Sequence, residues 1–220
     1  MEMILERLTS IATVVGLVLV GAVAWNRTAR AGYESAEYET IETDGKYEIR
    51  EYPDLMIVAT TTKIDAQGRD GSFMKLFRYI SGANEAKQKI SMTTPVFMEN
   101  DRAESEVQMG FVMPSEVAAG SVPTPSGEDV VVRKRAGGRF AVLRFSGRLS
   151  AKLAKEQEAK LRAWMKSKGL EADVPNHASE TATAVPQTAM SDSSGVEAAS
   201  YDPPFTPAPL RRNEVLIRLK

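Results

Sequence analysis

The chain has 220 residues, of which 43% are hydrophobic and 26% charged, values ordinary for a globular protein with one substantial domain or two small ones. Its 28 basic and 29 acidic residues nearly cancel, so no overall basic field favours nucleic acid as a partner. The lack of cysteine excludes disulfides and thiolate metal sites, and a single histidine, His177, argues against a histidine-built metal centre or catalytic triad.

The first distinctive segment is the uncharged run LTSIATVVGLVLVGAVAWN, between Arg7 and Arg27. At about 1.5 Å per residue, residues 8–26 reach roughly the 30 Å thickness of the hydrocarbon core of a bilayer. Trp25 would then meet the lipid interface, where aromatic side chains are enriched. We therefore expect residues 1–32 to form an N-terminal transmembrane helix, which anchors the protein, and its flank.

A cleaved signal peptide is the alternative for this segment. Either Ala22-Val23-Ala24 or Ala29-Arg30-Ala31 would serve as its cleavage motif. Against it, Glu2 and Glu6 precede the apolar run, whereas signal peptides begin with a positive region. The charges that flank the run are too few to decide the orientation, and an extracytoplasmic domain is our working expectation.

The body of the chain begins with KYEIREYPDLMIVATTT, which predicts two strands with Pro53 and Asp54 between them. DGSFMKLFRYISG then predicts a helix, with Asp70 as a candidate N-cap and Gly82 as its stop. Four of its apolar residues share one face at helical spacing: Phe73, Leu76, Phe77 and Ile80. Two more strands follow, KISMTTPVFM and EVQMGFVMP.

The second half repeats this order. EDVVVRKR and RFAVLRFSG predict two strands across a tight turn at Gly137 and Gly138. A helix follows from Ser150, its N-cap, to Gly169, with an apolar stripe of Leu153, Leu161, Trp164 and Met165. YDPPFTP takes the place of SMTTPVF, and NEVLIRL the place of EVQMGFV.

A period of about ninety residues indicates an internal duplication of a β-β-α-β-β unit. We expect the terminal strand to pair with its counterpart and complete a pseudo-symmetric antiparallel sheet or barrel. Residues 177–199 have almost no apolar periodicity and are expected to be a disordered surface insertion, which costs little in loop-closure entropy. Consecutive prolines at 203 and 204, followed by Asn213 and Glu214, suggest a corner that locks the fold.

Two long motifs at opposite ends of the body carry a family resemblance. FMKLFRYISGANEAKQKISMTTPVF contains a Tyr-aliphatic-x-Gly-x-Asn segment and a Met-Thr-x-Pro-Val strand, and YDPPFTPAPLRRNEVLIRL contains a Tyr-x-Pro-Pro-x-x-Pro turn and an Arg-Asn-Glu-Val strand. Residues 38–219 resemble the SOUL haem-binding protein family. The resemblance implies an α+β fold over residues 33–220, a distorted β-barrel of two similar halves with two flanking helices. That fold is similar to effector-binding folds related to gyrase-inhibitor proteins.

The resemblance also implies a haem or porphyrin ligand in an apolar cleft. A tetrapyrrole is a flat apolar plate with two propionates at one edge, so a binder needs an apolar surface with a basic rim. The candidate ligand-binding residues are Phe73, Met74, Phe77, Arg78 and Met92. Arg78 could hold a propionate through two hydrogen bonds. The alternative is that the apolar residues of this helix are only core.

No histidine is expected to ligate the iron, so axial ligation should be weak or absent. Some family members are thought to use a histidine and others to bind haem without one, and here no histidine falls in a matching motif. The methionines at 92, 98, 109 and 113 could approach a haem but also suit gap-filling in a core.

These observations predict a membrane-anchored haem- or porphyrin-binding protein without catalysis. One alternative is a small-molecule hydrolase with Glu48, Glu51 or Glu214 as general base, although no nucleophile motif or paired-carboxylate spacing supports it. The other is a membrane-tethered interaction module that uses ETATAVPQTAMSDSSGVEAAS as an accessible loop.

Overall fold

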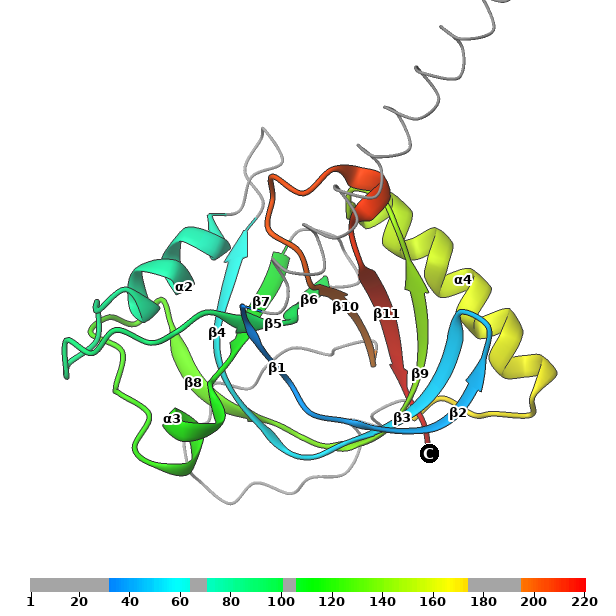
Figure 1. Ribbon diagram of the computed structural model, residues 1–220, viewed down its shortest axis with the longest axis horizontal. Helices are drawn as coiled ribbons and strands as arrows, with labels where there is room; N and C mark the ends of the chain where they lie inside the picture. The colour runs from blue at the N-terminus through cyan, green and yellow to red at the C-terminus, as the bar shows by residue number, and fades with distance from the viewer. Residues whose placement is uncertain (1–31, 64–70, 101–105, 174–194) are drawn as a thin grey trace, which may run out of the picture.

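The computed structural model describes residues 32–63, 71–100, 106–173 and 195–220. These residues form an α+β fold with a nine-stranded antiparallel sheet, a two-stranded parallel ribbon and three helices (Figure 1). The helices are α2 (Ser72–Ile80), α3 (Ser115–Ala119) and α4 (Ala151–Ser167), with a 3₁₀ turn η1 (Ala208–Leu210). The strands are β1 (Glu34–Ser35), β2 (Glu39–Asp44), β3 (Tyr47–Tyr52), β4 (Leu55–Lys63), β5 (Thr93–Thr94), β6 (Val96–Asn100), β7 (Glu106–Val112), β8 (Val131–Arg135), β9 (Gly138–Phe145), β10 (Val196–Ser200) and β11 (Asn213–Arg218).

The predicted duplication is visible in the order of the elements. β3-β4-α2-β6-β7 is followed by β8-β9-α4-β10-β11. The strand order in the sheet is β2-β3-β9-β11-β10-β6-β7-β4-β8. Outward from the β6–β10 pair, the order is β7, β4 and β8 on one side and β11, β9 and β3 on the other. Strands that are equivalent in the two repeats therefore lie at equal distances from this pair. We call this pair the seam, because there the two halves join.

Two details of the predicted pairing are wrong. The terminal strand β11 pairs with β9 and β10, and not with its counterpart β7. The sheet is also not closed into a barrel, because β2 and β8 stand at its two ends and do not pair with each other. The pairing of strands that are not neighbours in the chain depends on how the two repeats pack together, and the local sequence pattern does not encode this.

The glycine pair between β8 and β9 does not close a hairpin, which corrects a third expectation. β8 pairs with β4, and β9 pairs with β3 and β11. The connection between β8 and β9 crosses the connection between β3 and β4 at this point. A Cβ atom on Gly137 would lie 2.4 Å from the carbonyl oxygen of Tyr52. The amide of Gly137 donates to Oδ1 of Asp54 at 2.8 Å. Glycine is needed here for close approach of two backbones.

Helix α2 packs on β4 and β7. Leu76 and Ile80 are buried against the sheet, whereas Phe73 and Phe77 are exposed, so only half of the predicted apolar face is core. Gly71, with φ of 68°, occupies the N-cap position, and Asp70 lies outside the described residues. Gly82, with φ of 113°, follows the helix as predicted.

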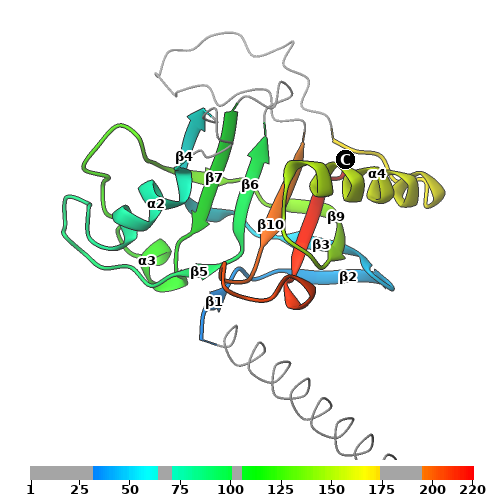
Figure 2. The same ribbon diagram turned by 90° about the horizontal axis from the view of Figure 1, so that it is seen from above.

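Helix α4 packs on β9 and β11, which are the equivalents in the second repeat of the strands β4 and β7 beneath α2 (Figures 1 and 2). The predicted N-cap is confirmed, since Ser150 Oγ accepts a hydrogen bond from the amide of Leu153 at 3.2 Å. Leu161 and Met165 are buried, and the Trp164 ring stacks on Tyr47 with centroids 5.0 Å apart.

The predicted insertion ends earlier than expected. Residues 196–199 belong to β10, which lies between β6 and β11 in the middle of the sheet. The equivalent of the SMTTPVF strand is therefore VEAAS, and YDPPFTP forms a turn. Residues 174–194 lie outside the described residues, as does the expected anchor at residues 8–26. None of the described helices is long and apolar enough to cross a bilayer.

Candidate functional site

An apolar surface lies on the solvent side of α2. Phe73, Met74 and Phe77 are 40%, 51% and 44% exposed, and we call these three residues the α2 apolar face. Phe73 and Phe77 are one helical turn apart, so their rings stack at 6.0 Å between centroids and 12° between planes. The Phe73 ring also meets the edge of Phe111, 5.4 Å away between centroids. Two nearly parallel rings on a helix surface offer a flat apolar wall.

Basic side chains flank this wall. Lys75 is half-buried and forms an ion pair with Asp129 at 3.3 Å. Arg78 is exposed in the last turn of α2 and forms no ion pair with the described part of the chain. Of the two cations, Arg78 is therefore the one available to an anionic group beside the α2 apolar face.

Met92 is placed differently from the other four candidate residues. It is half-buried against the hydrophobic cluster beneath α2, which includes Leu76, Tyr79, Ile80 and Phe111. Met109 and Met113 pack in the same cluster. The structure thus brings Phe73, Met74, Phe77 and Arg78 together on one surface, while these methionines pack as core residues.

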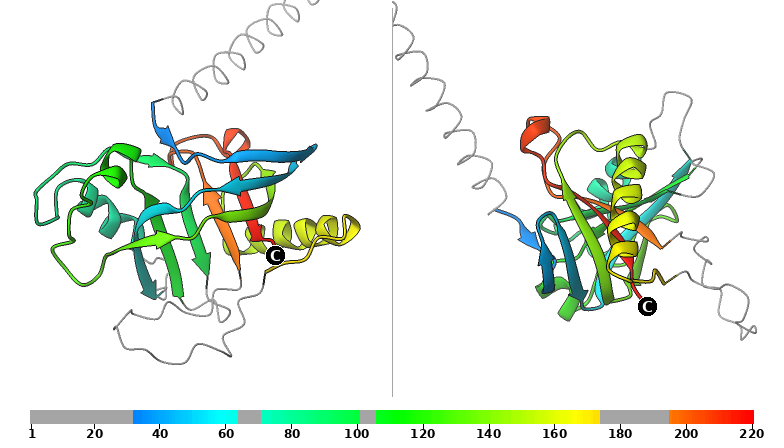
Figure 3. Two further views of the ribbon diagram at one scale, coloured as in Figure 1. Left: turned by 90° about the horizontal axis from the view of Figure 1, so that it is seen from below. Right: turned by 90° about the vertical axis from the view of Figure 1, so that its right-hand side faces the viewer.

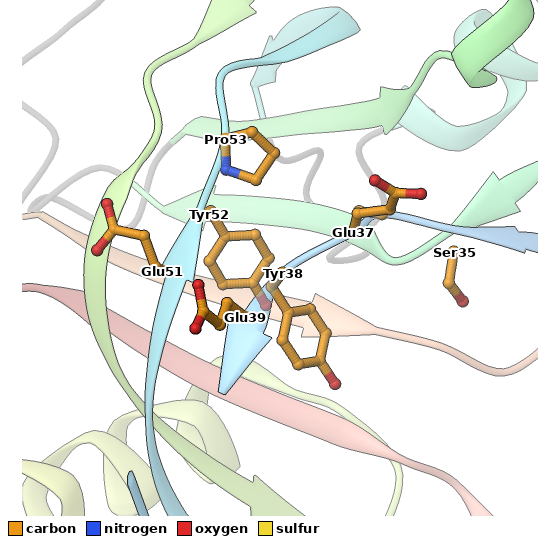
Figure 4. Close-up of a pocket in the computed structure, with 8 residues that line it drawn as sticks. Ser35, Glu37, Tyr38, Glu39, Glu51, Tyr52 and Pro53 are labelled. Carbon is orange, nitrogen blue, oxygen red and sulfur yellow. The ribbon is translucent and has the colours of Figure 1, made fainter. Parts of the chain in front are cut away.

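A second candidate site is an open cleft of about 770 Å³ beside β1 and the end of β3 (Figure 4). The rings of Tyr38 and Tyr52 lie at its centre, 5.2 Å apart between centroids. Three carboxylates surround them, those of Glu37, Glu39 and Glu51, and none of the described basic residues lines the cleft. The remaining lining residues are Ser35, Ala36 and Pro53. An anionic ligand would be repelled here.

The two tyrosines of the cleft rest on a buried ionic cluster. Glu214 on β11 accepts two hydrogen bonds from Arg50, at 2.7 and 3.0 Å, and one from the Tyr201 hydroxyl at 2.8 Å. Arg212 binds the same carboxylate at 2.7 Å. The Arg50 guanidinium carbon lies 4.1 Å from the centroid of the Tyr38 ring. The corner expected at Glu214 is thus built from side chains. Arg50 comes from β3, 164 positions earlier in the chain, whereas Tyr201 follows β10 and Arg212 precedes β11.

This cluster decides the protonation of Glu214. Burial opposes its ionisation, but the hydrogen bonds and charges of Arg50 and Arg212 outweigh burial and lower the pKa of Glu214 to about 2. Glu48 is likewise bound by Arg50, at 2.7 Å, and by Arg144, at 3.2 Å. Two of the three glutamates considered as general bases are therefore held by arginines.

Another cluster of charged side chains spans the seam, and no sequence pattern had indicated it. Glu99 on β6 and Glu197 on β10 stand on directly paired strands. Arg133 lies 3.6 Å from Glu99, and Arg135 donates to Glu197 at 3.0 Å. Burial and then the charge of Glu197 raise the pKa of Glu99 to about 7, against the opposing effect of the two arginines. Within the described residues, no cluster of His, Cys, Asp or Glu could hold a metal ion.

The family model described as SOUL heme-binding protein matches residues 33–218 of the chain, most of its length. The chain belongs to the SOUL heme-binding protein family. Heme-binding protein 2 of Homo sapiens is 34% identical over 133 residues, which cover 57% of this chain and 64% of that protein. The chain thus aligns with less than two thirds of that relative. Heme-binding protein 1 of Mus musculus is 27% identical over 198 residues, 87% of this chain and 88% of the relative.

Solved structures with little sequence identity share this architecture. The C-terminal domain of EcmrR is 11% identical, with a TM-score of 0.50 over 83% of this chain and 98% of the domain. A hydrolase from Listeria innocua is 12% identical, with a TM-score of 0.52 over 82% and 94% of the two chains. At such identities, these likenesses show the fold alone.

In this SOUL-family chain, the Tyr-aliphatic-x-Gly-x-Asn motif shapes the end of α2. Asn84 donates to the carbonyls of Tyr79 and Gln88 at 3.0 and 2.8 Å. The Tyr79 hydroxyl donates to the carbonyl of Pro123 at 2.7 Å. Near the other end of the chain, Asn213 donates to the carbonyl of Gly147 at 2.9 Å. Both motifs hold backbone in place, so their contribution to a site is to position α2 and β11.

Proposed function

We propose that this chain binds haem or a related porphyrin on the α2 apolar face and does so without catalysis. The observation that carries the proposal is the pair of stacked, exposed rings of Phe73 and Phe77 with the exposed Arg78 beside them. A porphyrin plane can lie against such a wall, and each Å² of apolar surface that it covers contributes about 25 cal/mol. Membership of the SOUL heme-binding protein family supports the same ligand.

Charge distinguishes this surface from the cleft at Tyr38 and Tyr52. A porphyrin carries two propionates, which the carboxylates of Glu37, Glu39 and Glu51 would repel. On α2 the exposed cation Arg78 lies one residue from Phe77 and would attract them. The ligand is therefore assigned to α2.

The absence of catalysis is proposed from the state of the glutamates. A general base must exchange its proton near the working pH, and a carboxylate with a pKa of about 2 in contact with two arginines is poorly suited to that role. Glu51 lines the open cleft, where the hydroxyl of Ser35 is hydrogen-bonded to that of Thr94 at 2.8 Å.

We also propose that residues 8–26 anchor the protein in a membrane, on the basis of their length and lack of charge. The domain that follows would then hold its ligand close to a bilayer, from which an apolar porphyrin can partition.

The first prediction concerns binding on α2. The chain from Tyr33 onward, titrated with haemin, should show a Soret change with a micromolar or tighter Kd. Arg78→Glu places a negative charge beside the propionates and should weaken binding roughly ten-fold, which corresponds to about 1–2 kcal/mol. Phe77→Asp should weaken it at least as much, because it removes one ring of the wall. Phe205→Asp is the matched control, since Phe205 is also exposed but lies outside α2.

Two further arms test how the ligand is held. His177→Ala should leave the Soret position and the affinity unchanged, and metal-free protoporphyrin should bind nearly as well as haemin, because burial rather than iron ligation holds the macrocycle. Equal losses in Phe77→Asp and Phe205→Asp would remove α2 as the site. Loss of the Soret band in His177→Ala would replace this account by histidine ligation.

A further inference from the structure

The turn between β10 and η1 presents an apolar tip to solvent. Phe205 is 77% exposed, the highest value among the large hydrophobic side chains of the described residues. Its neighbours Pro204, Pro207, Ala208 and Pro209 are exposed as well. We call residues 203–209 the proline tip. Isolated exposed apolar residues are common, but a contiguous apolar projection indicates an interaction surface.

The proline tip is held in this shape by its own hydrogen bonds. Arg211 donates through Nε to the carbonyl of Thr206 at 2.8 Å and through Nη2 to the carbonyl of Pro204. The amide of Thr206 donates to the carbonyl of Pro203 at 3.0 Å, and the carbonyl of Ala208 accepts from the amide of Gly147 at 3.0 Å. Proline further restricts the backbone. Phe205 therefore remains in water because the turn is fixed there.

The proline tip lies on the side of the molecule where the described chain begins. β1 and the turn that leads into η1 are both at the lower edge of Figure 2 and toward the left of the right-hand panel of Figure 3. The expected membrane span ends at residue 26, and five residues, 27–31, lead from it to the described fold, which begins at residue 32. Even fully extended, they reach only about 20 Å. This side must then face the bilayer closely.

We propose that the proline tip inserts Phe205 into the lipid–water interface of the membrane in which residues 8–26 are anchored. The inference rests on the proposed anchor. Phe205 and the prolines would enter the boundary between headgroups and acyl chains, where aromatic and apolar side chains are stable. Arg148, exposed next to Gly147, lies at the base of the tip and suits lipid phosphates. The tip is then a second membrane contact that fixes the orientation of the domain.

The chain has no cysteine, so a single introduced thiol reports on one position. The full-length variants Phe205→Cys and Lys166→Cys are labelled with an environment-sensitive fluorophore and reconstituted into phosphatidylcholine vesicles. Lys166 is exposed in the last turn of α4 and serves as the matched control, because α4 lies away from β1 in Figure 2. The label at 205 should be quenched by nitroxides carried on the lipids and protected from aqueous iodide. The label at 166 should show the opposite pattern.

Flotation of the vesicles separates the possible failures. If the protein floats with the lipid but the label at 205 is as accessible to iodide as that at 166, the insertion of Phe205 is wrong and the anchor stands. If the protein does not float, the anchor is wrong and the insertion falls with it. Protection from iodide without quenching by lipid nitroxides would mean that protein, not lipid, covers the tip, which also overturns the proposal.

Discussion

At the scale of single residues, the most consequential side chain is a carboxylate buried in the middle of the sheet. Glu214 is fully buried and is compensated by Arg50, which is itself fully buried, and by Arg212. A buried charge is tolerated only with such partners, and removal of one partner leaves the other charge uncompensated. Each charge of the cluster therefore depends on the others, and the fold-locking role predicted for the C-terminal motif can be tested at Glu214.

Glu214→Gln should reduce the free energy of unfolding by about 3–5 kcal/mol, because Arg50 loses its counter-charge in a buried position. Urea denaturation at pH 7 measures the loss. Glu51→Gln, at the rim of the open cleft, is the control and should change stability by less than about 0.5 kcal/mol. Equal effects of the two substitutions would show that the buried pair is no more important to stability than a surface carboxylate.

At the scale of elements, the exposed face of α2 and the chain crossing at Gly137 both depend on how one element packs against another. In α2, Phe73 and Phe77 form one stripe and Leu76 and Ile80 the neighbouring stripe. The sheet covers the second stripe and leaves the first to solvent. A helix pattern alone does not reveal which part of a wide apolar face is covered, and this determines whether the two rings can receive a ligand.

The second feature is the crossing at Gly137, where the connection between β8 and β9 passes the connection between β3 and β4. It predicts that a side chain at position 137 destabilises the fold. Gly137→Ala would place a Cβ atom 2.4 Å from the Tyr52 carbonyl oxygen and 2.5 Å from the carbonyl carbon of Pro53, so backbone must move. We expect a loss of stability of about 2 kcal/mol or more. Gly127→Ala, where nothing lies within 4 Å, is the matched control and should be neutral. Thermal denaturation of both variants compares them, and identical Tm values would contradict the close crossing.

At the scale of the whole molecule, the two halves join through the β6–β10 pair, and Glu99 and Glu197 place two carboxylates at this seam. Their neighbours from β7 and β8 are Gln108, Arg133 and Arg135. Because Arg135 is bound to Glu197, Glu99 is left with the longer contact to Arg133, and its burial favours the protonated form. We therefore expect the stability of the joined halves to depend on pH near neutrality.

The pKa of Glu99, raised from 4.5 to about 7 by burial and by Glu197, sets the direction of this dependence. Between these values the folded state holds a proton that the unfolded state has lost. Stability should therefore fall as pH rises from about 4.5 through about 7, by about 3 kcal/mol in total. Glu99→Gln cannot lose this proton and should remove the decline. Urea denaturation at pH 5 and pH 8 tests it, with Glu158→Gln on the surface of α4 as control.

If the free energy of unfolding fell by the same amount between pH 5 and pH 8 in the wild type and in Glu99→Gln, the decline would not originate at the seam. A decline removed equally by Glu158→Gln would lead to the same conclusion.

The sequence alone was sufficient for the duplication, the order of the main strands and helices from β3 to α4, the Ser150 cap and the SOUL resemblance, because each depends on local periodicity or on a contiguous motif. It also identified the residues of α2 that the structure exposes. The strand order, the Gly137 crossing, the Glu214 cluster and the β6–β10 seam depend on residues far apart in the chain. Arg50 and Glu214 are 164 positions apart, and no local pattern records that burial of one charge requires the other. Only the packing of the two halves against each other determines which carboxylates are neutralised and which apolar side chains of α2 remain free for a ligand.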